Sequence, residues 1–295
     1  MMESGFITEG YFDHYNADKS ELLAEKTVIV RRNYLFHEEE TTRRYEFTFT
    51  PSMGFLGCPE PLLNNTELKI SFDRTRPECA LIATGAITHA CDYIEIKDCY
   101  AITEYISSPD IRQYFETIDT SPIIYEYDTV DVWIKNIPKG EKDIRFDNIR
   151  GGNNPSFLCL GLIPQSSLNG DFDRCSTSFR NHNLTDVNIT LNGNSVNSFP
   201  INIKNNSLIY PLFKFLDATD QLYNNQCGST LTINDFESNY LIAHKFECEI
   251  SNTGWLGINL KLSEAPPDSE PLALVVWFIH EARIAIDKFH SVEKL

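Results

Sequence analysis

Apolar residues alternate with polar ones, or form short unbroken runs, over most of the chain from residue 45 onwards. Strict alternation is typical of strands with one buried face, and short apolar runs bounded by turn-forming residues are typical of fully buried strands. The run at 157–163 ends at Pro164 and predicts a strand buried on both faces. A long polar loop follows, and the next predicted strand ends at the Asn-Gly turn signal of residues 192–193.

The same patterns predict several other elements. Further strands are expected at 45–49, 68–72, 91–106, 256–262 and 272–286, and residues 123–135 are expected to form one long strand or a pair of strands. Three short helices are expected: one capped by Ser107 to Asp110 and continuing to 118, one at 208–216, and one opened by a capping box at 232–235. Long polar loops connect these elements.

About eleven strands of modest length with a few short helices in the loops predict an all-β, mainly antiparallel fold. We expect a jelly-roll β-sandwich, although the patterns alone also fit other antiparallel β-proteins. Residues 1–43 are polar and mixed in charge, so we interpret them as an N-terminal arm or linker. Residues 44–295 are then the jelly-roll domain.

Composition narrows the function classes. The 295 residues include 42% hydrophobic residues, too many for a disordered chain. The formal net charge of −17 argues against direct nucleic-acid binding, since neutralising phosphates requires clustered Lys and Arg. The first residues show no basic region followed by an apolar one, and the apolar run at 272–279 is too short to span a bilayer. We therefore expect an intracellular protein that is neither secreted nor inserted in a membrane.

Eight cysteines without a Cys-x-x-Cys pair favour reduced, mostly buried thiols over a disulfide framework. Two candidate catalytic or metal-binding patterns are incomplete. His280-Glu281 lacks the second histidine of a zinc-protease helix, because Ile284 stands at that position. Cys175 and His182 share a loop, but no third residue that would orient the histidine is evident.

Acidic residues flank the central strand at Asp143 and Asp147 on one side and at Asp171 and Asp173 on the other, without the spacing of a calcium loop. No glycine-rich phosphate-binding motif is present in the sequence. We therefore expect no catalytic, cofactor-binding or metal-binding residues, no cofactor, and no enzyme activity.

The stretch from 156 to 193 resembles a block in the major capsid proteins of Polinton/Maverick elements and adintovirus-like viruses. There, a buried strand ending Gly-Leu precedes a Phe-Asn-Gly loop, a Phe-rich segment with a nearby His, and a strand ending Asn-Gly. The matching positions are Gly161-Leu162, the Leu-Asn-Gly of 168–170, Phe179 with His182, and residues 192–193. Residues 239–246 stand where this family has its Gly-Tyr-x-x-Phe-x-Phe-Asp strand. The resemblance covers roughly residues 45 to 290, in order.

This resemblance implies a capsid subunit of viral or transposon origin, a domesticated copy included, that self-associates into homotrimers or other capsomers and resides in the virion. The family carries two jelly rolls per chain, and this chain has length for the second one. A separate first jelly roll or a minor capsid protein is therefore an expected partner. We expect the subunit contacts in the loops 165–183 and 193–206. The alternative function is a lectin-like or other recognition β-sandwich, which the Asn-rich loops and exposed aromatic residues would fit.

Overall fold

The structure is a computed structural model of the whole chain, which divides into two compact units, Met1–Gly57 and Cys58–Leu295. The residues it describes are 54–58, 60–63, 66–73, 75–76, 79, 99–101, 103, 106, 109, 115–116, 121–171, 174–196, 201–202, 208–222, 231–246, 253–267 and 270–295. The described part of the first unit is one short 3-10 helix, Gly54–Gly57. The arm boundary predicted at 43/44 lies outside the described residues and stays a prediction.

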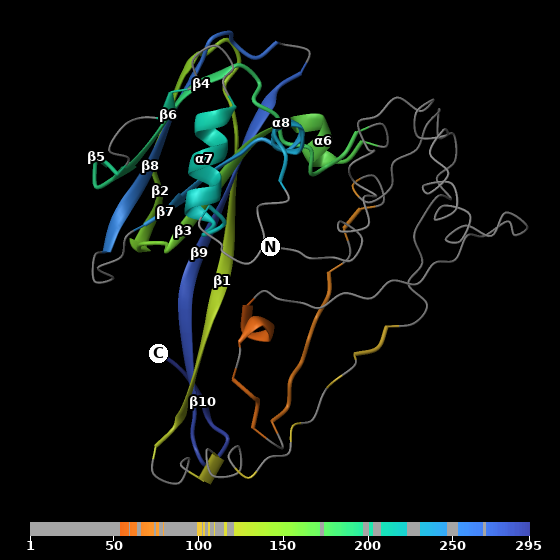
Figure 1. Cartoon of the computed structure of the whole chain (residues 1–295), viewed down its shortest axis with the longest axis vertical. Helices are drawn as coiled ribbons and strands as arrows, with labels where there is room; N and C mark the ends of the chain where they lie inside the picture. The colour runs from red at the N-terminus through yellow and green to blue at the C-terminus, as the bar shows by residue number, and fades with distance from the viewer. Residues whose placement is uncertain are drawn as a thin grey trace, which may run out of the picture. The chain divides into compact units, whose positions relative to one another are not determined.

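Two antiparallel sheets form the second unit (Figure 1). The first has the strand order β1 (Ile123–Asn136), β9 (Leu272–Ile286), β3 (Phe157–Pro164) and β7 (Leu241–Lys245). The short strand β10 (Val292–Lys294) pairs with the end of β9. Only the first half of β9, up to Ile279, pairs with β3, so its second half continues with β1 and β10 as a ribbon beyond the sandwich.

The second sheet has the order β2 (Asp143–Asn153), β8 (Thr253–Leu262), β4 (Leu184–Leu191) and β5 (Asn194–Ser195), with β6 (Ile201–Asn202) also paired to β4. Strands β1, β3, β7 and β9 therefore lie in one sheet, and β2, β4, β6 and β8 lie in the other. Among the described strands, the chain crosses between the sheets at six of nine connections and stays within a sheet only at β4–β5, β5–β6 and β9–β10. Repeated crossing of this kind is typical of a jelly roll. The predicted fold class, an antiparallel jelly-roll sandwich with short helices in its loops, is confirmed.

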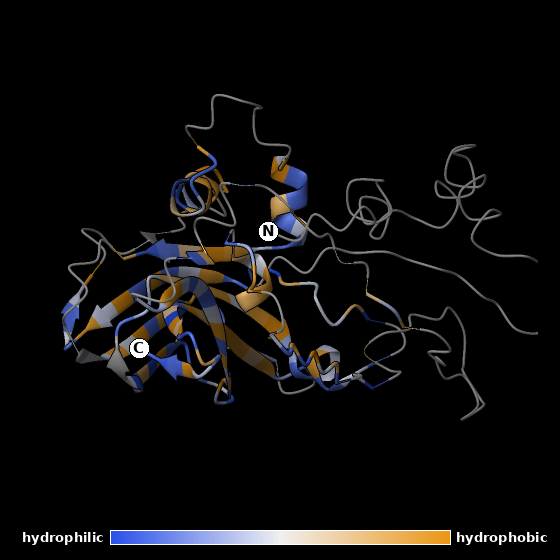
Figure 2. Cartoon of the chain, turned by 90° about the horizontal axis from the view of Figure 1, so that it is seen from below, coloured by the Kyte–Doolittle hydropathy of each residue, from blue (hydrophilic) through white to orange (hydrophobic). Residues whose placement is uncertain are grey.

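Side chains of both sheets meet in one main core. Alternate residues of β3, namely Leu158, Leu160 and Leu162, point into it, opposite Ile258 of β8 and Ile189 of β4, and all of these are fully buried. Figure 2 shows the resulting alternation of hydrophobic and hydrophilic positions along the strands. Burial of alternating apolar side chains between two sheets is what stabilises this architecture.

Within the described ranges, the α-helices with given bounds lie in the connections: α6 (Gln165–Asn169) after β3, and α7 (Ile209–Ala218) and α8 (Ile233–Ser238) between β6 and β7. Both helices predicted between 208 and 238 are confirmed, and α8 has the predicted capping box, with Thr232 and Asp235 bonding each other's backbone N–H. Of the first predicted helix, the described residues Pro109, Phe115 and Glu116 are helical.

The strand predicted at 68–72 is wrong: residues 66–73 are described and belong to no strand. Alternation marks a chain that can bury one face, but a strand also needs a neighbouring edge. The strands predicted at 45–49 and 91–106 fall largely outside the described residues. Strand β2 was missed because a register shift between Phe146 and Arg150, with Asn148 at φ 53°, interrupts its alternation.

Candidate assembly surfaces

The central block is organised by close contact between β3 and the loop that follows it. The Phe179 ring lies against Gly161, where an added Cβ would come within 2.7 Å of the ring and 2.8 Å of Leu241. Phe179 also packs edge-on against Trp277 of β9, with ring centroids 5.2 Å apart. Its carbonyl accepts a hydrogen bond from the backbone N–H of Tyr240 (2.8 Å). Gly161 and Phe179, which the resemblance had singled out, therefore meet on the outer face of the first sheet.

The turn after β4 is fixed by its backbone conformation and by a side-chain hydrogen bond. Asn192 and Gly193 have φ angles of 52° and 80°, the left-handed values that a tight two-residue hairpin requires. The Asn192 carboxamide oxygen accepts a hydrogen bond from the backbone N–H of Trp255 (2.9 Å) on β8. The sequence signal at 192–193 thus marks a real hairpin, β4 to β5. The prediction that the loops 165–183 and 193–206 make subunit contacts stays a prediction.

Helix α7 has an apolar residue at nearly every position. Leu212 and Phe215 pack against the main core, with the Phe215 ring 5.8 Å from that of Phe236 in α8. At the C-terminal end, Thr219 donates a hydrogen bond to the Phe215 carbonyl, and Asp220 forms an ion pair with Lys245 of β7 (2.6 Å). One face of α7 is therefore anchored on the jelly roll.

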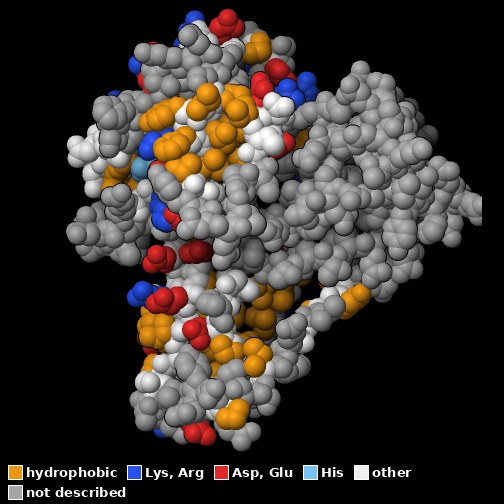
Figure 3. Space-filling view, viewed as in Figure 1, with side chains coloured by type: hydrophobic (Ala, Val, Ile, Leu, Met, Phe, Trp, Pro, Cys, Tyr) orange, Lys and Arg blue, Asp and Glu red, His pale blue; other side chains and the backbone are white. Residues whose placement is uncertain are grey.

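The opposite face of α7 is apolar as well. Ile209, Tyr210 and Phe213 are 70%, 38% and 42% exposed, and we call these three residues the α7 surface. Figure 3 shows hydrophobic side chains gathered over this helix. The polar residues of α7 are Lys214 and Asp217, which form an ion pair (3.9 Å) one turn apart. Clustered exposed apolar residues mark interaction sites. Sequence reasoning identified the helix but not this second face.

A polar cluster lies where the ribbon leaves the sandwich. Arg150 of β2 forms an ion pair with Asp131 of β1 (2.5 Å), and its guanidinium lies 5.6 Å from the centre of the Phe278 ring. Nε2 of His280 lies 3.9 Å from the Asp131 carboxylate. Burial and the neighbouring Arg150 charge lower the pKa of His280, and the hydrogen bond from Arg150 lowers the pKa of Asp131. His280 is therefore neutral near pH 7.

The residue pairs considered for chemistry do not assemble into sites. His280 and Glu281 lie on a strand, with His280 buried and Glu281 exposed. Cys175 contacts Thr177, whereas His182 lines a hollow beside Glu264 and Glu270. Burial raises the pKa of the Cys159 thiol to about 12, so this thiol is inert at neutral pH.

Two of the acidic residues that flank the central strand, Asp147 and Asp171, have arginine partners. Asp147 pairs with Arg145 (2.8 Å), and Asp171 lies 3.7 Å from Arg174. Asp143 is paired in the sheet with Lys261, and Asp173 lies outside the described residues. Across the described ranges, no group of three or more His, Cys, Asp or Glu residues could hold a metal ion.

Two hollows lined by described residues are small. One of about 220 Å³ is lined by Cys58, Glu60, Ile124 and Glu126, and that beside His182 measures about 50 Å³. Pockets that enclose drug-sized ligands usually measure about 300–1,000 Å³. Within the part of the chain that is described, no helix is long and apolar enough to cross a membrane.

Comparison with known proteins gives matches by structure alone. No protein-family model matches the sequence, and no curated protein matches it. Similar solved structures include the PBCV-1 virus capsid (10% identity, 63% of this chain and 54% of that chain, TM-score 0.36), the Sputnik virophage (12%, 59% and 39%, 0.36) and the Faustovirus major capsid protein (12%, 60% and 36%, 0.36). The chain thus spans about half or less of the length of these relatives. At TM-scores this low, the likeness supports no conclusion about function.

Proposed function

We propose that this protein is a capsid-type structural subunit that self-associates through the α7 surface. The observation that carries this proposal is a helix anchored on a jelly roll by one apolar face while Ile209, Tyr210 and Phe213 present a second apolar face to solvent. Covering such a surface with another protein lowers the free energy of the system, because apolar area is removed from water.

The jelly roll itself is shared by capsid, lectin and enzyme domains, so fold alone does not decide between them. Two features of this chain favour the structural role. The resemblance to capsid proteins centres on a block whose Gly161 and Phe179 pack together in the structure. The hollows beside Cys58 and His182 are too small for an enclosed small-molecule site.

The finer form of this proposal follows from the resemblance. It comprises descent from a Polinton/Maverick or adintovirus-like capsid protein, a homotrimeric capsomer, location in the virion, and partnership with a separate first jelly roll or a minor capsid protein. It also includes the jelly-roll domain at 44–295, the subunit contacts in the loops 165–183 and 193–206, and the absence of catalytic residues and cofactors. No nucleic acid or membrane is a direct partner in this proposal.

The test is size-exclusion chromatography with light scattering on the purified chain over a range of concentrations and salt. We expect oligomers that salt strengthens, since two copies of charge −17 repel each other. Phe213→Glu should raise the dissociation constant of the oligomers at least tenfold, because assembly would bury a carboxylate in an apolar contact.

The control is Lys139→Glu in the turn after β1, an exposed residue. It changes the net charge by about two units against one for Phe213→Glu, so a general charge effect would be larger in the control. A wild-type chain that stays monomeric under all conditions would contradict the proposal, as would oligomers that Phe213→Glu leaves intact.

A further inference from the structure

Residues 66–73 have the pattern of a strand but belong to no strand in the described part of the chain. Leu68 and Ile70 alternate with Glu67 and Lys69, and all four side chains are exposed, Leu68 by 47% and Ile70 by 42%. The segment runs through eight described residues without joining a β-ladder. An alternating segment of this kind is suited to pairing with the edge of another sheet.

The first sheet offers such an edge. In the described part of the chain, β1 pairs with β9 on one side and with no strand on the other. Ile137 donates a backbone hydrogen bond to Leu272 (2.9 Å), which continues the register of β1 with β9. Because antiparallel strands alternate the direction of their backbone groups, Val130, Val132 and Ile134 direct their N–H and C=O groups away from β9. Long edges of this kind are templates for pairing with another chain.

We infer that residues 66–73 pair, as an added antiparallel strand, with the free edge of β1 in a second copy of this chain. The register places Leu68 opposite Ile134 and Ile70 opposite Val132, so exposed apolar side chains of both strands meet on one face. On the other face, Glu67 lies opposite Lys135. The same register therefore satisfies apolar contact, hydrogen bonding and charge.

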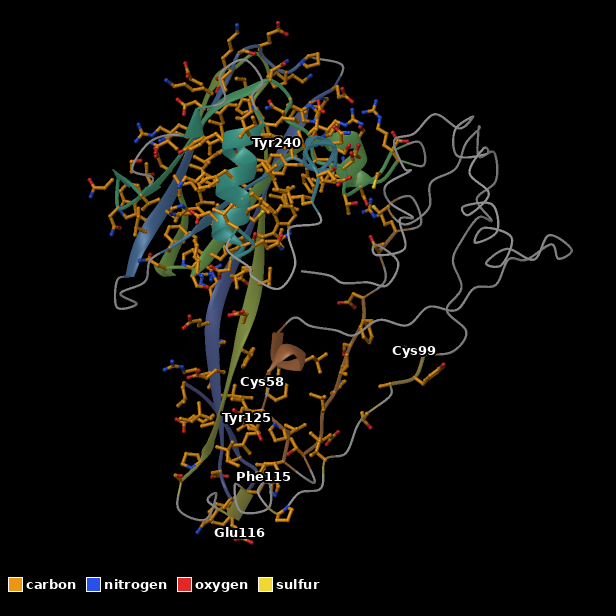
Figure 4. All side chains as sticks on the ribbon, viewed as in Figure 1. Cys58, Cys99, Phe115, Glu116, Tyr125 and Tyr240 are labelled. Atoms are coloured by element: carbon orange, nitrogen blue, oxygen red, sulfur yellow. The ribbon has the colours of Figure 1, made fainter. Side chains whose placement is uncertain are left out.

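A hydrogen bond near the start of the segment excludes this register within one chain, so the pairing in this register requires a second copy. The backbone N–H of Leu63 donates to the hydroxyl of Tyr125 (3.3 Å), which is labelled on the ribbon in Figure 4. Lys135 lies ten residues further along β1, about 33 Å away at the rise of a strand. The four residues from Leu63 to Glu67 span at most about 14 Å, so Glu67 cannot reach Lys135 of its own chain, even with the Tyr125 side chain added.

This inference rests on the proposed self-association but uses a different contact from the α7 surface. The first experiment is hydrogen exchange with mass spectrometry on the full-length protein at low and high concentration. The amides of Leu68, Ile70, Val130, Val132 and Ile134 should exchange at least tenfold more slowly in the oligomer, because pairing sequesters the N–H groups that face the partner strand.

The second experiment uses substitutions and the oligomer dissociation constant. Ile70→Pro should weaken association at least tenfold by removing a hydrogen-bond donor from the added strand, while Ile70→Thr, which keeps the donor and the β-branched shape, should weaken it less. Val132→Pro and Val132→Thr form the matched pair on β1, because proline is tolerated on a free edge. Thermal unfolding of each diluted variant checks that the fold is retained.

The third experiment tests the register by exchanging charges. Glu67→Lys or Lys135→Glu alone should weaken association by roughly two- to fivefold, since like charges would then lie opposite each other. The double variant should restore wild-type association with an unchanged net charge. A purely structural role of either residue would show no such restoration.

The outcomes separate this inference from the proposed function. Oligomers that depend on Phe213, with unprotected amides in 66–73 and no effect of Ile70→Pro, would overturn the strand pairing and keep the α7 surface. Protection of 66–73 with restoration by the charge exchange, but no effect of Phe213→Glu, would support the pairing and overturn the α7 surface. Protection that is equal at low and high concentration would mean pairing within one chain and overturn the inference.

Discussion

Both faces of the first sheet carry apolar side chains, but different parts of the chain pack against them. The inner face is covered by a complete second sheet, and its residues Leu160 and Phe278 are almost fully buried. The outer face has a small cluster, in which Phe179 covers Ile163, Ala273 and Val275. Beyond that cluster, Val132 and Ile134 of β1 are exposed. One face thus holds the fold together, and the other leaves apolar surface available for contacts.

The largest effect is expected from matched deletions on the two faces. Leu160→Ala should lower the free energy of unfolding by about 2–5 kcal/mol, because it opens a cavity in the main core. Leu241→Ala removes the same atoms from the partly buried outer cluster and should cost about 1 kcal/mol, since water and loop movement can fill the space. Urea denaturation measures both. Equal losses would mean that the outer cluster is as tightly packed as the core.

Gly161→Ala should show an intermediate effect on the outer face. Its new methyl group would lie 2.7 Å from the Phe179 ring and should cost about 1–3 kcal/mol of stability through overpacking. The double variant Gly161→Ala with Phe179→Ala should be more stable than the sum of the two single losses predicts, because removing the ring relieves the clash. Simple additivity in the same denaturation assay would contradict the contact.

The smallest expected effect is a loss of stability at low pH. It tests His280, which lies on the inner face of β9 where the main core ends and the ribbon begins. The pKa of His280 is lowered in the folded state, so between pH 7 and 5 the unfolded chain binds more protons than the folded one. Stability should therefore be complete above the ordinary histidine pKa of about 6.5 and fall as the pH drops through it. The melting temperature of wild type should decrease over this range.

His280→Asn, which cannot take up the proton, should flatten that decrease. His182, whose pKa is also lowered by burial, remains and should leave a residual slope. The double variant with His182→Asn should be flatter still. An unchanged pH profile in His280→Asn would show that the buried imidazole is not a source of acid sensitivity.

Much of the fold could be predicted from local pattern. Strands β3, β4, β8 and β9 and helices α7 and α8 lie where alternation, apolar runs and the capping box at Thr232 predicted them. Strand β2 could not be predicted, since its register shift breaks the alternation. The segment at 66–73 was mistaken for a strand, since alternation does not say whether a partner edge exists.

The candidate surfaces depended more on tertiary structure. The composition of α7 predicted a helix with an apolar face, but only the packing of Leu212 and Phe215 on the core shows that Ile209 and Phe213 are left outside. Likewise, Gly161 and Phe179 stood out in sequence, while their mutual contact required the loop to fold back onto β3.

By itself, the sequence determined the class of fold, the position of most strands, and the absence of any recognised catalytic motif, because these depend on local periodicity and on motif spacing. Tertiary structure alone decided which apolar residues are covered, which edge of β1 has no paired strand among the described residues, and how far Leu63 is tethered from Lys135. These properties depend on distances between residues remote in sequence, which no local pattern records.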